Sequence, residues 1–115
     1  MTSTRKSLAV LFALALVGAG TAWAGPTRWQ RNHPRRTEVN KRLGNQNQRI
    51  QQGRAKGTLT PGQARALHHE DRQVRQEERD MAAQNGGHIT RQEQRTLNAQ
   101  ENRISKKIYA EKNPQ

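Results

Sequence analysis

The chain has 115 residues and a formal net charge of +12, contains no cysteine, and is 30% hydrophobic and 3% aromatic. The lack of cysteine excludes disulfide bonds, thiol chemistry and a lipid anchor on a cysteine. The excess of positive charge and the small number of apolar residues predict one small domain at most and favour an anionic partner.

The first 24 residues have the layout of a secretory signal peptide. Arg5 and Lys6 precede an apolar run over residues 8–17, and Ala22-Trp23-Ala24 supplies the small residues that a signal peptidase recognises. The run has half of the ~20 residues that a membrane-spanning helix needs. A retained N-terminal anchor is the alternative. We therefore predict cleavage after Ala24, a periplasmic or secreted bacterial location, and no transmembrane span after cleavage.

The first predicted helix spans residues 35–52 and follows a segment, residues 25–34, that we expect to be a disordered basic arm. Leu43 and Ile50 lie seven residues apart in this helix, which places them two turns apart on one face. The helix is therefore expected to use this face to contact other helices.

Basic residues are concentrated at the start of the predicted exported chain. Residues 25–59 contain nine bases and the single acid Glu38, whereas ten bases and eight acids follow. An excess of this size predicts contact with an anionic partner, with arginine well suited to phosphate. A basic segment that only keeps the chain soluble is the alternative. The predicted anion-binding residues are Arg28, Arg31, Arg35, Arg36, Lys41 and Arg42.

The second and third predicted helices, residues 61–84 and 91–111, begin at a repeated capping motif. In this motif a threonine hydroxyl accepts a hydrogen bond from the backbone N–H three residues later. The Gln or Glu side chain at that later position accepts a hydrogen bond from the backbone N–H of the threonine. Glycines before each motif are expected to end the preceding helix with a positive φ. The predicted cap residues are Thr60 with Gln63 and Thr90 with Glu93, and the predicted glycines are Gly53, Gly57, Gly86 and Gly87. Residues 112–115 are expected to be a disordered tail.

The seven-residue spacing of the first helix recurs in the other two, which predicts an all-α fold of three antiparallel helices. Polar residues stand between the paired aliphatic residues, where a coiled coil would have an apolar one. The core is therefore expected to be thin, and a second copy of the chain is a possible way to complete it. The predicted helix-contact residues are Leu43, Ile50, Leu67, Val74, Leu97 and Ile104.

Metal binding and catalysis have weak support in the sequence. The glycine-containing turns resemble degenerate EF-hand loops, but the positions of the first three ligands carry no acid. His68, His69 and Asp71 form a weak transition-metal candidate with two ligands at most in helical spacing. We expect no cofactor and no catalytic residue, because the acids Glu77, Glu78 and Asp80 are expected on an exposed helix face. Asp71 and Arg75 are spaced for an ion pair along that helix.

The motif Leu59-Thr60-Pro61-Gly62-Gln63 resembles the L-T-x-x-Q motif of the Spy and CpxP family of periplasmic stress proteins, and Ile89-Thr90-Arg91-Gln92-Glu93 is a looser copy. That resemblance implies a small, basic, helical protein forming cradle-shaped dimers with a chaperone or sensor-inhibiting role. The exported chain also resembles uncharacterised exported proteobacterial proteins with G-x-[LI]-T-x-x-[EQ] repeats and an end like Ile108-Tyr109.

These observations predict a periplasmic, non-enzymatic binding protein that is chaperone-like or linked to envelope stress. Its expected partner is an anionic envelope component or an unfolded protein, with homo-oligomerisation possible. One alternative is a metal-linked periplasmic protein. Another is binding to nucleic acid or lipopolysaccharide.

Overall fold

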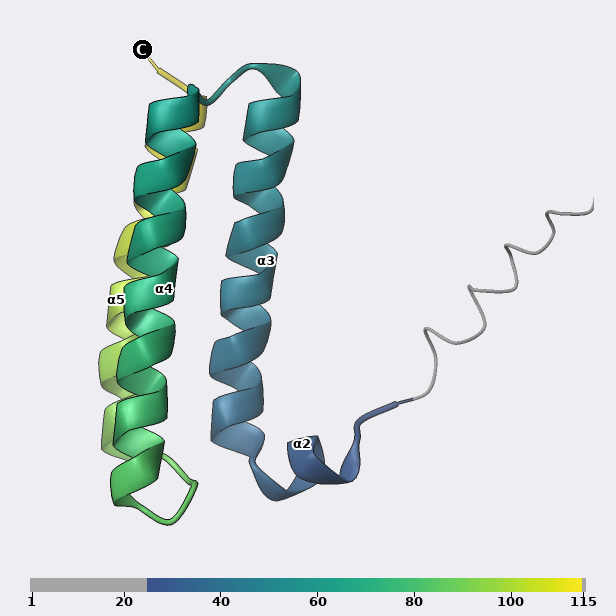
Figure 1. Ribbon diagram of the computed structural model, residues 1–115, viewed down its shortest axis with the longest axis vertical. Helices are drawn as coiled ribbons and strands as arrows, with labels where there is room; N and C mark the ends of the chain where they lie inside the picture. The colour runs from purple at the N-terminus through teal and green to yellow at the C-terminus, as the bar shows by residue number, and fades with distance from the viewer. Residues whose placement is uncertain (1–24, 115) are drawn as a thin grey trace, which may run out of the picture. The chain divides into compact units, whose positions relative to one another are not determined.

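The structure is a computed structural model that describes residues 25–114 (Figure 1). Its regular elements are all helices: α2 (Arg28–Asn32), α3 (Pro34–Lys56), α4 (Pro61–Gln84) and α5 (Arg91–Lys112). The prediction of an all-α fold is confirmed, with one short helix beyond the three expected. The predicted signal peptide, residues 1–24, lies outside the described residues.

The chain divides into two units, with the boundary after Arg31. The first unit contains most of α2, and the second contains α3, α4 and α5. In the second unit each helix packs against both others, and α4 runs antiparallel to α3 and α5 (Figure 1). None of the helices within residues 25–114 combines the length and the hydropathy that crossing a membrane requires.

Helix α2 forms within the segment that the sequence analysis expected to be disordered. The Thr27 hydroxyl accepts a hydrogen bond from the Gln30 backbone at 3.1 Å, and the Gln30 side chain accepts one from the Thr27 backbone at 2.8 Å. The Arg31 guanidinium donates to the Pro26 carbonyl at 2.8 Å. The sequence therefore held a third copy of the T-x-x-[QE] capping motif that the prediction overlooked.

The two predicted capping boxes start α4 and α5. Gln63 and Glu93 each donate a backbone hydrogen bond to the hydroxyl of the threonine three residues earlier, at 3.1 Å and 3.0 Å. The return bonds to Thr60 and Thr90 measure 2.9 Å and 2.8 Å. These bonds satisfy backbone donors that have no partner within the helix, so the motif fixes where each helix begins.

Helix α3 ends later than predicted because Gly53 is a helix residue and not a cap. The cap is Gly57, which has a φ of 80° and donates its N–H to carbonyls of the last turn. Gly86 and Gly87 also have positive φ values, as expected. Gly53 is buried because Leu59 packs on it: a Cβ atom at Gly53 would lie 2.6 Å from Leu59 Cδ1.

Two glycines inside α3 offer a matched test of this close approach. We expect Gly53→Ala to lower the free energy of unfolding by about 1 to 2 kcal/mol, because the added methyl group overlaps the buried Leu59 side chain. We expect Gly44→Ala to raise it by about 0.5 to 1 kcal/mol, because alanine favours the helix and nothing lies within 4 Å. Urea unfolding followed by circular dichroism measures both. Equal effects of the two substitutions would contradict the packing of Leu59 on Gly53.

The interior of the second unit follows three- and four-residue spacing along each helix. The six predicted helix-contact residues all lie in it and are at most 5% exposed. Because one chain covers these side chains, the bundle leaves no aliphatic seam open for a second copy. Among the described residues, the exposed large hydrophobic side chains are Trp29, at 41%, and Tyr109, at 65%. Homo-oligomerisation stays a prediction without support from this core.

Candidate functional site

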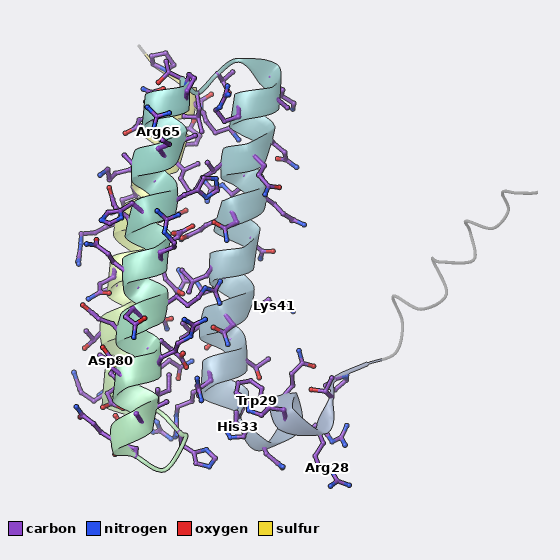
Figure 2. All side chains as sticks on the ribbon, in the orientation of Figure 1. Arg28, Trp29, His33, Lys41, Arg65 and Asp80 are labelled. Carbon is purple, nitrogen blue, oxygen red and sulfur yellow. The ribbon has the colours of Figure 1, made fainter. Side chains whose placement is uncertain are left out.

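The predicted anion-binding residues fall into two groups. Arg28 and Arg31 are exposed on the first unit, and Lys41 is exposed on α3; Figure 2 labels Arg28 and Lys41. Arg35, Arg36 and Arg42 are partly buried on α3. The first group has side chains that solvent reaches, whereas the second group contacts the rest of the bundle.

Arg36 binds a buried carboxylate of α4. Its guanidinium donates to both oxygens of Glu78, with Nη2 3.2 Å from Oε1, and Nη1 donates to the Gly87 carbonyl at 3.1 Å. The Glu78 side chain is 1% exposed. The expectation that Glu78 lies on an exposed face is therefore wrong, because α3 covers it and supplies the paired charge.

Arg42 and Arg35 also hold α3 against the rest of the bundle. Arg42 Nη1 lies 3.4 Å from Oε1 of Glu101, whose side chain is fully buried, and another Arg42 nitrogen donates to Asn102. Arg35 donates to the Ile89 carbonyl at 3.3 Å. These three arginines therefore have structural partners within the bundle, and these partners account for part of the excess of basic residues in α3.

Four exposed bases lie toward one end of the bundle. The α3–α4 connection and the C-terminal end of α5 lie at this end, and Figure 2 places Arg65 near the start of α4 (Figure 1). These four exposed basic side chains at this end of the bundle form no ion pair with an acid of residues 25–114. The acid Glu70 is already paired, with Lys107. We call these residues the basic end: Arg54, Lys56, Arg65 and Lys106.

A layer of polar side chains crosses the middle of the core. Gln46 of α3, Asp71 of α4 and Glu101 of α5 are 4%, 2% and 0% exposed. They occupy the positions between the seven-spaced aliphatic residues, so helical spacing directs them inward. The Gln46 amide nitrogen donates to the Glu101 carbonyl at 2.8 Å. We call these three residues the polar layer; they are among the polar residues that stand between the paired aliphatic residues, and their burial was not predicted.

The polar layer has more acceptors than donors. Gln46 Oε1, both carboxylate oxygens of Asp71 and both of Glu101 are buried without a hydrogen-bond partner. The expected Asp71–Arg75 ion pair does not form, since Arg75 donates instead to Asn40 at 3.4 Å. A buried acceptor without a donor costs free energy of folding, so this layer lowers the stability of the bundle.

Burial raises the pKa of both carboxyl groups. The pKa of Asp71 rises from 3.8 to about 6, chiefly through desolvation, with Arg75 lowering it and Glu70 raising it. The pKa of Glu101 rises from 4.5 to about 7, chiefly through desolvation, with Arg42 lowering it and Asp71 raising it. The charge of Asp71 therefore opposes ionisation of Glu101.

The histidine and acid residues of the weak metal candidate do not converge. Asp71 is buried, His69 is exposed, and His68 Nδ1 lies 3.0 Å from Asn47 Oδ1. Elsewhere in the bundle the rings of His33 and His88 stack with centroids 4.6 Å apart. Within residues 25–114, no group of three or more His, Cys, Asp or Glu side chains is arranged to hold a metal ion.

Comparison with protein-family models found no matching family, and comparisons with curated proteins and with solved structures found no match. The resemblance to the Spy and CpxP family and to the exported repeat proteins stays a prediction from the capping motifs.

Proposed function

We propose that the exported chain is a non-enzymatic binding protein of the bacterial envelope that attaches to anionic lipid headgroups. The observation that carries this proposal is the setting of the two large aromatic side chains that are exposed within residues 25–114. Arg28 and Arg31 flank Trp29, and Lys106 and Lys112 flank Tyr109. Tryptophan and tyrosine favour the membrane–water interface, and neighbouring bases attract anionic headgroups.

The bases at the end of the bundle that carries Tyr109 support the same partner. Arg54, Lys56 and Lys106 of the basic end are exposed at the end of the bundle that includes the last turns of α5. Each base near an anionic surface contributes about 1 kcal/mol of attraction. An anionic lipid surface is therefore favoured over an unfolded protein client, because the aliphatic side chains that would hold such a client are buried.

Binding of the predicted exported form, residues 25–115, to phosphatidylglycerol vesicles tests the proposal. Trp29 is the one tryptophan of this form, so a blue shift of its fluorescence reports contact. We expect binding to weaken at least tenfold between 50 and 300 mM NaCl and to be undetectable on phosphatidylcholine, since salt screens exposed charges. Salt-insensitive binding, or equal binding to both vesicles, would contradict the proposal.

A charge-matched pair of variants locates the contact. Removing three bases of the basic end, by Arg54→Gln, Lys56→Gln and Lys106→Gln, is expected to weaken vesicle binding by at least tenfold. Removing three exposed bases elsewhere, by Arg72→Gln, Arg79→Gln and Arg91→Gln, is expected to weaken it less than threefold. Equal losses would show a dependence on net charge alone. Deleting the N-terminal bases is not suitable, because Arg36 and Val39 belong to the bundle.

A further inference from the structure

We propose that the polar layer is a buried proton-binding site that makes the stability of the bundle depend on pH, with Asp71 and Glu101 as the groups that take up protons. This inference is independent of lipid binding. It rests on the three side chains of the layer, their burial, and the imbalance between acceptors and donors around them.

The hydrogen-bond acceptors of the polar layer that lack a donor are the first support for this proposal. Five buried oxygen atoms of Gln46, Asp71 and Glu101 have no hydrogen-bond partner. An ionised carboxylate accepts only, whereas a protonated carboxyl group also donates through its O–H. Protonation of Asp71 and Glu101 therefore adds two donors to a place that has unpartnered acceptors. It also removes two negative charges from the low-dielectric core.

The charged surroundings are the second support, because they do not neutralise the layer. Among residues 25–114, Arg42 is the one base within ion-pair distance of either carboxylate, at 3.4 Å from Glu101, and its side chain is 32% exposed. Arg75 donates to Asn40, and Lys107 is paired with Glu70. The charged groups that act on the two carboxyl groups are Glu38 and Arg42 of α3 and Glu70 and Arg75 of α4, and the charge of Asp71 acts on Glu101. The titratable side chain of His68, three residues before Asp71, contacts Asn47 of α3.

The direction of the pH effect follows from the two carboxyl groups. Each has a folded-state pKa above its ordinary value: about 6 against 3.8 for Asp71, and about 7 against 4.5 for Glu101. The folded chain therefore binds more protons than the unfolded chain between about pH 4 and pH 7. The contribution of these groups to stability is complete below that range and is lost as the pH rises through it.

Urea unfolding at pH 5 and pH 8 tests the proposal on the predicted exported form. We expect the folding equilibrium constant to be roughly 100- to 1,000-fold larger at pH 5, because the raised pKa values contribute factors of about 10 for Asp71 and about 70 for Glu101 between these two pH values. The variant Asp71→Asn with Glu101→Gln keeps the shapes and removes both titrations. We expect its folding equilibrium constant to change less than threefold between the two pH values.

Two controls separate the polar layer from other titrating groups. The variant His68→Gln should keep the pH dependence of the wild-type chain, and Glu77→Gln, at an exposed position, should keep it as well. If the wild-type chain and the variant Asp71→Asn with Glu101→Gln show the same pH profile, the proposal is overturned.

Carbon-13 NMR of the side-chain carboxyl groups gives a second measurement that needs no variant to fold. In the wild-type chain we expect the Asp71 and Glu101 signals to titrate above pH 5.5. Titration of both signals below pH 5.5 would overturn the proposal.

Discussion

Replacing Arg36 with alanine is expected to lower the free energy of unfolding by about 3 to 5 kcal/mol at pH 7. The Arg36 guanidinium donates to both oxygens of Glu78, and the Glu78 side chain is 1% exposed. Without Arg36 the carboxylate would stay in the core with no opposite charge, which is among the costliest single changes in a small domain. Urea unfolding followed by circular dichroism at 222 nm measures the loss.

Two further variants separate the loss of the ion pair from the loss of packing. Replacing both partners, by Arg36→Leu and Glu78→Leu, should recover most of the stability, because apolar residues of similar size often substitute for a buried pair. Arg79→Ala, at an exposed position beside Glu78 in the sequence, should change stability by less than about 0.5 kcal/mol. A loss below 1 kcal/mol for Arg36→Ala would mean that Glu78 reaches solvent when Arg36 is removed.

Replacing Asp71 with leucine is expected to raise the free energy of unfolding by about 2 kcal/mol at pH 8. Asp71 is 2% exposed, and neither of its carboxylate oxygens has a hydrogen-bond partner. An unsatisfied buried polar group costs about 1 to 3 kcal/mol, and more when it is charged, so an apolar side chain removes a penalty and adds burial. The neighbouring core residues Leu67 and Val74 provide apolar contacts on the same helix face.

The exposed acid Asp80 is the matched control for this substitution. Asp80→Leu lies on the same helix, and we expect it to change stability by less than about 0.5 kcal/mol. The gain from Asp71→Leu should also shrink at pH 5, because burial raises the pKa of Asp71 to about 6 and the wild-type carboxyl group is then largely neutral. A loss of stability at both pH values would show that the site lacks room for leucine.

Local chemistry made the helix starts predictable from the sequence. Thr60 with Gln63 and Thr90 with Glu93 act on backbone groups three residues away, so their effect does not depend on the rest of the fold. The same reasoning applied to Thr27 and Gln30 would have predicted α2. Gly53 was misassigned as a cap because its role depends on Leu59, which packs on it from the following connection.

The candidate sites were less predictable, because their residues come from different helices. Charge counting along the chain identified the basic start of the sequence, but it could not show that Arg36 and Arg42 meet Glu78 and Glu101. It also could not show that bases from the end of α3, the start of α4 and the end of α5 share one end of the bundle (Figure 1).

The sequence by itself determined the helical class, the starts of α4 and α5, and the aliphatic residues that form the core, because capping and helical periodicity are properties of neighbouring residues. Only the tertiary structure decided which polar residues became interior. Gln46, Asp71 and Glu101 occupy inward positions of the same spacing that places the leucines, and burial by the two opposing helices turns three ordinary polar side chains into a desolvated layer.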